Sequence, residues 1–170
     1  TFSDKNVGTG KTVTVNSISL ADGTNGGLAL NYSISSGQTT TANITTKALT
    51  VSGIISSNKA YDGTTTATLG TGSVVYGGLV SGDTLTGTYS GVFNNANVGT
   101  GKTVTITSSY GGADVNNYTI TDQASTTADV TTKALTATAS ASNKVYDATN
   151  NATTTLILSG LVGDRKSTRL

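Results

Sequence analysis

Two copies of a Gly-Thr-Gly-Lys-Thr motif, at residues 8–12 and 99–103, are the first candidates for chemistry. A phosphate-binding loop needs a further glycine five residues before the second motif glycine, and a helix after the lysine whose N-terminus holds the phosphate. Lys5 and Ala96 stand at that glycine position, and an alternating Val-Thr-Val or Val-Thr-Ile run follows the motif. The motif is therefore interpreted as a glycine-rich turn that enters a strand, and no nucleotide site is expected.

A second group of candidates could contact a ligand through tyrosine rings. Tyr61 could stack on a sugar while Asp62 accepts hydrogen bonds from its hydroxyl groups. The structural alternative, which we favour, makes Tyr61 a core or corner anchor and Asp62-Gly63 a turn with the glycine at positive φ. Three further tyrosines could extend a ligand-contacting patch: Tyr76, Tyr89 and Tyr110.

Composition argues against most catalytic and metal sites. The 170 residues contain no Cys and no His, and every acidic residue is Asp. There is thus no thiol nucleophile, no ordinary general base near neutral pH and no imidazole metal ligand. Calcium prefers several clustered carboxylates, whereas the aspartates are spread along this chain. We expect no catalytic residue, no cofactor and no metal, so the chain is not expected to be an enzyme.

Charge and hydropathy argue against two further classes of partner. The net charge is +1 and only 11% of residues are charged, whereas a nucleic-acid-binding protein carries a basic excess on one face. No apolar run approaches the length of a membrane-spanning helix. We therefore expect neither nucleic-acid binding nor membrane insertion.

The elements that would position these residues are short strands. Thr, Val, Ile and Tyr favour pleated, half-buried surfaces, and no window shows sustained helical spacing of apolar residues. About seven strands separated by turn clusters predict an all-β fold, with an immunoglobulin-like β-sandwich as the first choice and a β-grasp-like arrangement as the alternative. The clearest alternation of apolar residues comprises Leu28, Leu30, Tyr32 and Ile34.

Internal repetition is the strongest pattern in the sequence. Residues 45–50 return unchanged at 131–136, and residues 7–15 and 57–62 return at 98–106 and 142–147 with one substitution each. The offsets lie between 85 and 91, which indicates a unit of about 85 residues with short insertions or deletions in its loops. A period of this length matches tandem small domains better than a solenoid coil.

The repeats predict where the domains begin and end. Residues 1–47 are assigned to the C-terminal part of a truncated repeat, 48–133 to one complete repeat, and 134–164 to the N-terminal part of a third. Residues 165–170 are interpreted as a non-native tail. They hold both arginines of the chain, Arg165 and Arg169, and resemble a translated sequencing adapter.

Five motifs follow one another in the order seen in a known repeat family, at residues 59–64, 78–83, 98–104, 117–120 and 128–136. In this order they resemble the YDG repeat domain of large bacterial surface proteins, especially filamentous-haemagglutinin-like adhesins. The resemblance covers about residues 2–164 and implies an extracellular, repeated β-domain without catalytic residues. The sequence departs from the family pattern at Ala148, where glycine is expected, and at Thr46 and Thr132, where proline is expected.

The main functional hypothesis is structural: spacer or stalk repeats of a bacterial cell-surface or secreted adhesin. The expected partners are neighbouring repeats of the same chain, with host glycan or protein bound through other parts of the parent protein. The alternative is a carbohydrate- or protein-binding module of an adhesin, which would use the candidate tyrosines and Asp62.

Overall fold

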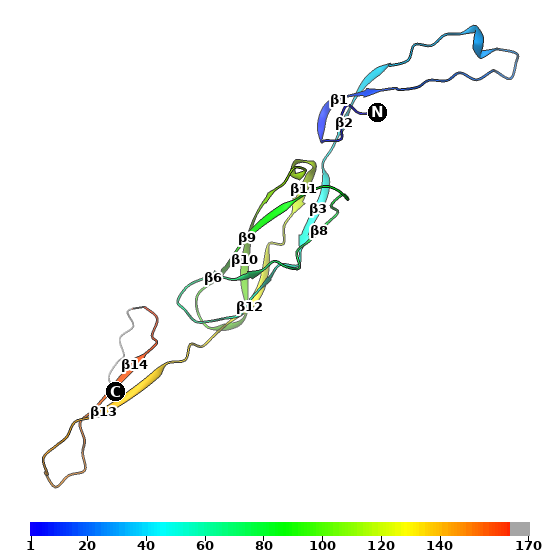
Figure 1. Ribbon diagram of the computed structural model, residues 1–170. Coiled ribbons are helices and arrows are strands. Elements are labelled where there is room, and N and C mark those ends of the chain that lie inside the picture. The colour runs from blue at the N-terminus through cyan, green and yellow to red at the C-terminus, as the bar shows by residue number, and fades with distance from the viewer. Residues whose placement is uncertain (164–170) are drawn as a thin grey trace. The chain divides into compact units, whose positions relative to one another are not determined.

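The computed structural model describes residues 1–163, and nearly all of its regular structure is β-strand (Figure 1). Within these residues the only helices are two three-residue 3-10 turns, η1 (Ala29–Asn31) and η2 (Val115–Asn117). The prediction of an all-β chain is confirmed. The tail predicted at residues 165–170 lies outside the described residues.

The chain forms two compact units, and each takes strands from the central range 48–133 and from one terminal range. The repeat boundaries, the immunoglobulin-like sandwich and the β-grasp-like alternative all stay predictions. Unit 1 contains Thr1–Ser52, Val75–Gly87 and Tyr110–Asp122, and unit 2 contains Gly53–Val74, Thr88–Ser109 and the chain from Gln123 onward.

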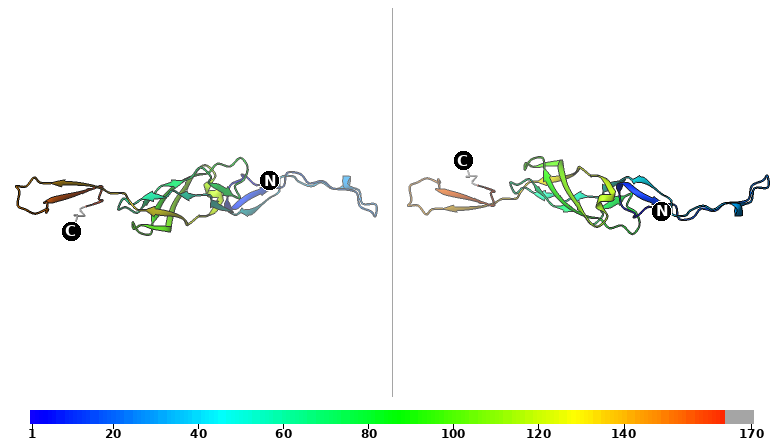
Figure 2. Two further views of the ribbon diagram at one scale, coloured as in Figure 1. Left: turned by 90° about the horizontal axis from the view of Figure 1, so that it is seen from below. Right: turned by 90° about the horizontal axis from the view of Figure 1, so that it is seen from above.

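In unit 1, β1 (Gly8–Thr14) and β2 (Thr39–Ile44) pair as an antiparallel hairpin. The chain between them runs out and back as two neighbouring segments, with η1 near the far end (Figures 1 and 2). Only Thr45 and Thr46 separate β2 from the next strand, β3 (Lys47–Ser52). The hairpin is therefore joined to the following sheet almost without a linker.

Strand β3 is the middle strand of a three-stranded sheet in unit 1. It pairs in parallel with β11 (Tyr118–Thr121) and antiparallel with β8 (Val75–Gly77). The alternation of β3 sends Leu49 and Val51 inward, where they are 1% and 4% exposed, while their neighbours in the strand face solvent. Burial of this apolar face stabilises the sheet.

Unit 2 is built around a five-stranded sheet in the order β5-β12-β10-β9-β6. On β10, Lys102, Val104 and Ile106 point inward and alternate with exposed threonines. This is the period of two that the sequence predicts for a half-buried strand. The strands are β5 (Lys59–Ala60), β12 (Ser125–Thr131), β10 (Gly99–Gly111), β9 (Thr86–Phe93) and β6 (Thr66–Ala67).

The core of unit 2 consists of five buried apolar residues, and the side chains of Tyr61 and Leu69 pack against it. Two short antiparallel ladders complete the unit: β4 (Ile55–Ser56) with β7 (Leu69–Gly70), and β13 (Thr136–Ala141) with β14 (Thr154–Ser159). The buried cluster comprises Ala67, Phe93, Val104, Ala128 and Val130.

The two Gly-Thr-Gly-Lys-Thr motifs lie inside strands and fold alike. In β1, the register shifts between Gly8 and Lys11, and in β10 it shifts between Gly99 and Lys102. The glycine within each irregularity has positive φ, 60° at Gly10 and 57° at Gly101. The motif is therefore a bulge within a strand, which corrects the interpretation that it precedes one.

The alternating run from Leu28 to Ile34 does not form the strand that its pattern predicts. It contains η1, and Leu30 and Tyr32 are 80% and 71% exposed. The corresponding residues 118–121 do form a strand, β11, because β3 pairs with it. No strand of unit 1 pairs with residues 32–35, so these residues do not form a strand despite their alternating pattern.

The turn after β3 supplies a test of the fold. Gly53 has φ of 86°, and a Cβ built on it would clash with the carbonyl oxygen of Ser73. We expect Gly53→Ala to lower the free energy of unfolding by about 2–4 kcal/mol, through positive φ and overpacking. The control Gly72→Ala adds a Cβ with no atom within 4 Å, and denaturant unfolding should show a far smaller loss. Equal losses would contradict this account.

Candidate functional site

The Tyr61-Asp62-Gly63 motif forms a closed turn held by Lys59 and Thr64. Asp62 Oδ1 accepts hydrogen bonds from the Thr64 amide at 2.8 Å and the Thr64 hydroxyl at 2.9 Å. The Lys59 ammonium lies 2.8 Å from the same oxygen and donates to the Thr64 carbonyl at 2.9 Å. These bonds lower the pKa of the Asp62 carboxyl to about 2, mainly through Lys59. Asp62 Oδ1 therefore makes its hydrogen bonds and its ion pair within the turn.

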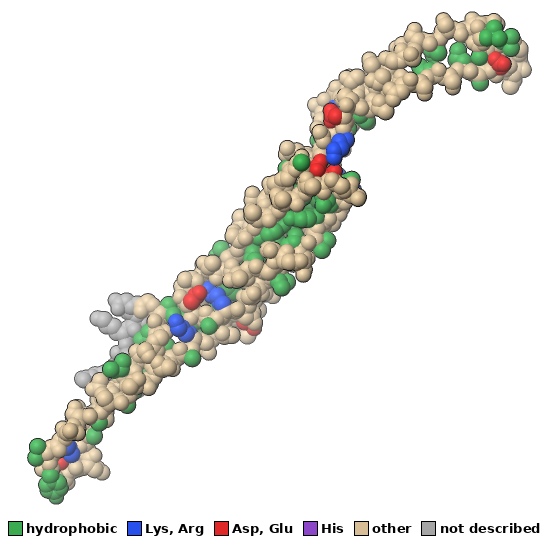
Figure 3. All heavy atoms as spheres, viewed as in Figure 1, with side chains coloured by type: hydrophobic (Ala, Val, Ile, Leu, Met, Phe, Trp, Pro, Cys, Tyr) green, Lys and Arg blue, Asp and Glu red, His purple; other side chains and the backbone are tan. Residues whose placement is uncertain are grey.

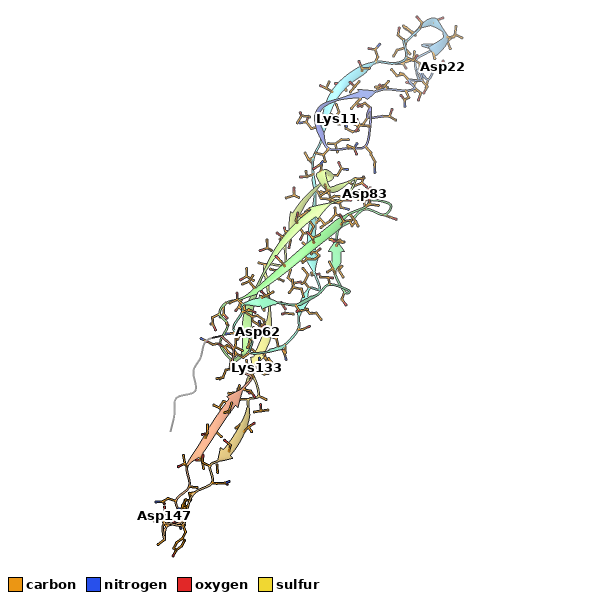
Figure 4. All side chains as sticks on the ribbon, turned by 60° about the vertical axis from the view of Figure 1, so that its left-hand side comes forward. Lys11, Asp22, Asp62, Asp83, Lys133 and Asp147 are labelled. Carbon is orange, nitrogen blue, oxygen red and sulfur yellow. The ribbon has the colours of Figure 1, made fainter. Side chains whose placement is uncertain are left out.

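The same turn recurs between β13 and β14. Figure 4 labels Asp147 in this turn. Lys144 Nζ lies 2.8 Å from Asp147 Oδ1, which accepts from the Thr149 amide at 3.0 Å. Ala148 takes the position of Gly63 with φ of 56°. The substitution therefore leaves the hydrogen bonds of the turn in place, although alanine pays the cost of a left-handed conformation.

The five candidate ligand contacts do not gather into one patch within either unit. Tyr61, Asp62 and Tyr89 belong to unit 2, whereas Tyr76 and Tyr110 belong to unit 1. All four tyrosines are only partly exposed. The Tyr61 ring packs against the core, and the Tyr110 hydroxyl donates to Asp122 Oδ1 at 2.5 Å. Tyr61 is therefore used for packing, and Tyr110 for an internal hydrogen bond.

A denser polar network lies in unit 1, where the segment before β1 meets the loops beyond β8 and β10. The Lys5 ammonium lies 3.1 Å from Asp83 Oδ1 and 3.1 Å from Asp114 Oδ1. The Val7 amide donates to the side-chain oxygen of Asn117 at 2.9 Å. The hydrogen bonds that the Lys5 ammonium donates to Asp83 and Asp114 raise the pKa of Lys5. We call the residues Lys5, Val7, Asp83, Asp114, Asn117 and Tyr118 the junction.

Tyr118 is the buried member of the junction. Its side chain is 7% exposed, its hydroxyl donates to Asp83 Oδ2 at 2.6 Å, and it accepts from the Val80 amide at 3.0 Å. Burial, followed by the bond to Asp83, raises the pKa of the phenol. Because Asp83 also binds Lys5, one carboxylate links the buried tyrosine to the exposed segment.

Unit 2 contains a surface built from the corresponding positions. In unit 1 a hollow beside the junction is lined by Val7, Lys47 and Val80, among others. In unit 2 a hollow is lined by Val98, Lys133 and Val162, which occupy the same places in the sequence repeat. Corresponding residues of the sequence repeat therefore line a hollow at two places along the chain.

Sequence reasoning missed the junction because its members look unrelated. In the sequence, Lys5 stands out only because it occupies the position where a phosphate-binding loop needs glycine. Asp83 and Asp114 are two of the aspartates that are spread along the chain. The available signal was positional: Lys5 comes just before a repeated motif, and Asp83 ends another. Within the described residues no group of three or more acidic, His or Cys residues is placed to hold a metal.

One segment of the chain matches the model of a known protein family. Residues 45–128 match the family model of the YDG domain. No curated protein and no solved structure matches the chain significantly. The matched segment includes the Asp62 turn and the junction residues Asp83, Asp114 and Tyr118. None of the helices in residues 1–163 has the length and apolar character needed to cross a membrane.

The phenol of Tyr118 gives the first test of the junction. Tyr118→Phe removes the bond to Asp83 and leaves the Val80 amide unpaired, so we expect a lower free energy of unfolding. The matched control is Tyr32→Phe at the corresponding position, where the ring is 71% exposed. Thermal unfolding followed by circular dichroism should show a lower midpoint for Tyr118→Phe alone. Equal midpoints for the parent protein and both variants would show that the Tyr118 hydroxyl does not stabilise the junction.

The Asp62 turn makes stability depend on pH. The folded pKa of about 2 lies below the ordinary 3.8, so the contribution of the carboxylate is complete above pH 5 and is lost as pH falls from about 4 towards 2. Asp62→Asn should be less stable than the parent protein at pH 7, and this gap should shrink as pH falls and close below pH 2. Denaturant unfolding at several pH values measures this gap. A gap that stays constant with pH would show that the charge contributes nothing.

Proposed function

We propose that the chain is a tandem array of small β-domains similar to the YDG domain, serving as a non-catalytic spacer in a bacterial cell-surface or secreted adhesin. The observation that carries the proposal is the junction. It ties residues 1–47 to the domain that follows, through an ion-pair network and a linker of two residues. A spacer needs such joints, since a freely jointed chain would coil instead of holding a distal part away from the cell.

The recurrence of local structure supports the array. Hairpin β1–β2 repeats the register of β10 with β12: Lys11 lies opposite Ala42 as Lys102 lies opposite Ala128. The Lys59 turn likewise recurs at Lys144. These pairs are separated by the offsets of the sequence repeat, so the same sequence forms the same local structure at each place.

The side chains available for chemistry also favour a passive role. Asp62 and its counterpart Asp147 are bound in turns, and Asp83 and Asp114 bind Lys5. The amides of the Gly-Thr-Gly-Lys-Thr bulges are used internally: Gly10 donates to Asn43 and Gly101 donates to Asp129. A composition rich in Thr, Ser, Asn and Gly with 11% charged residues suits an extracellular β-protein, and we include this location in the proposal.

A second candidate is a carbohydrate-binding module in unit 2. One hollow there is lined by hydroxyl-bearing residues of β9 and β10, and the buried hydroxyl of Ser108 has no hydrogen-bond partner within residues 1–163. The partly exposed Tyr89 offers an apolar ring face and a hydroxyl group there, which suits a ligand that, like a sugar, has apolar faces and hydroxyl groups. The lining residues are Thr88, Tyr89, Ser90, Thr107, Ser108 and Ser109.

Chain length distinguishes the two functions. Additional copies of residues 48–133 inserted after Lys133 should increase the maximum dimension, measured by small-angle X-ray scattering, by a constant step per copy. Strand β10 has 13 residues, which corresponds to about 43 Å at 3.3 Å per residue, so we expect steps of about 40 Å. Steps that shrink with each copy would refute the spacer. Glycan-array binding that Tyr89→Ala abolishes would favour the binding module.

A further inference from the structure

The Tyr-Asp-Gly turn of the central range is in contact with a loop from the range that follows it. Within unit 2, the loop of residues 160–162 lies against the turn, and a Cβ built on Gly63 would lie 2.7 Å from Val162 Cγ1. The same Cβ would lie 4.0 Å from the Tyr61 hydroxyl. A side chain at position 63 would therefore overlap Val162, so the valine packs on the bare Cα of the glycine.

Positive φ alone does not explain the glycine of this turn. Ala148 holds the corresponding position with φ of 56°, and its turn keeps the ion pair of Lys144 with Asp147. The turn therefore forms with alanine, at the cost of a left-handed conformation. What Gly63 adds is the space for Val162, which a β-carbon would fill.

The loop that carries Val162 has the same conformation in both copies of its sequence. Gly-Leu-Val occurs at 78–80 and at 160–162, and the glycine has φ of 95° in the first copy and 93° in the second. A Cβ built on this glycine would lie 2.8 Å from the carbonyl oxygen of Ala48 in the first copy and 3.5 Å from that of Ala134 in the second. Each loop is thus held by its own repeat. A valine presented in a preset position loses less conformational entropy on packing.

The surroundings of the contact suit an apolar side chain. The hollow beside it is lined by Tyr61, Val98, Leu135 and Val162, among others, and Lys133 is the one charged residue among the described lining residues. The aspartate of the turn makes its bonds within the turn. Figure 3 shows how few charged side chains the visible face of the chain carries. Packing of the valine here removes apolar surface from water without burying an unpaired charge.

The first copy of the loop has an equivalent place in unit 1. Val80 lines a hollow together with Val7 and Lys47, which correspond to Val98 and Lys133 in the sequence repeat. In both units, therefore, the valine of the loop lies beside the same two positions of the range that precedes it.

We propose that the Tyr-Asp-Gly turn is the surface on which each repeat receives the Gly-Leu-Val loop of the repeat that follows it. Gly63 is then a specificity-determining residue of the joint, because only glycine leaves room for the valine. The proposal rests on the tandem array given under Proposed function. It gives the glycine of the motif a role between repeats that the geometry of the turn alone does not require.

A double-mutant cycle in the full chain tests the contact. Gly63→Ala brings two costs, the left-handed conformation and the overlap with Val162, whereas in a Val162→Ala protein it brings only the first. A Cβ at position 63 would lie 4.0 Å from the Cβ of residue 162, which is an ordinary contact. In denaturant unfolding, Gly63→Ala should raise the unfolding equilibrium constant at least about fivefold more with Val162 present than with alanine there. Equal effects in both backgrounds would overturn the proposal.

Two control substitutions separate the contact from the cost of the turn. Val80→Ala changes the same residue of the other loop, whose atoms are not among those nearest to a Cβ at position 63. Its cycle with Gly63→Ala should therefore be additive, and a coupling as large as that of Val162 would overturn the proposal. Ala148→Gly measures the cost of the left-handed conformation by itself. The loss of stability from Gly63→Ala should exceed the gain from Ala148→Gly, and a gain as large as the loss would also overturn the proposal.

Small-angle X-ray scattering on the series with additional copies of residues 48–133 distinguishes this proposal from the array. In that series, Val80 of each inserted copy would pack on Gly63 of the copy before it. With Gly63→Ala in every copy, the steps in maximum dimension should shrink as copies are added, because the joints become flexible. Constant steps of equal size in the parent and variant series would overturn the role of Gly63 and leave the array standing. Shrinking steps in the parent series would refute the array, and the joint contact with it.

Discussion

The structure depends on the position of β3 between two strands that come much later in the chain. β8 pairs with it on one side and β11 on the other, so the first strand of the central range is completed only when the range is nearly finished. Backbone groups left without a partner are costly, and this requirement decides which alternating segments become strands. It explains why residues 118–121 form β11 while residues 32–35, with the same pattern, do not. The contact is long-range in sequence, so folding of this sheet is expected to be slow relative to that of the local turns.

The Asp62 turn and the junction show two different uses of the same residue types. In the turn, Lys59, Asp62 and Thr64 lie within six residues, and the arrangement forms again at Lys144 even though Tyr146 beside it is almost wholly exposed. It is therefore a local structure that needs no core. In the junction, Lys5 meets carboxylates that are 78 and 109 residues away. That network exists only because the β1–β2 hairpin continues almost directly into β3, which brings distant loops to the segment before β1.

The sequence was sufficient to predict the fold class, the position of the turns and the resemblance to the YDG domain, because these follow from short-range patterns. Alternation of Val104 and Ile106 with threonine predicts a half-buried strand, and the Asp-Gly pair at residues 62–63 predicts a turn at positive φ. Neither pattern predicts the parallel pairs of β11 with β3 and of β12 with β5, since pairing depends on contacts between distant residues. The Gly-Thr-Gly-Lys-Thr bulge was placed before the strand instead of within it, because a glycine at positive φ suits a bulge as well as a turn. The junction was invisible because no local pattern relates Lys5 to Asp83 and Asp114.

The two-residue connection between β2 and β3 has a mechanical consequence. A pull on the chain from its N-terminal side passes through Thr45 and Thr46 and enters β3 along the axis of the strand. The hydrogen bonds from β3 to β11 and to β8 run across that axis. The load is therefore applied as shear, with many bonds resisting at once, whereas a hinge at this point would let them open one after another. A stretched chain would then hold its folded sheet until a sharp rupture force is reached.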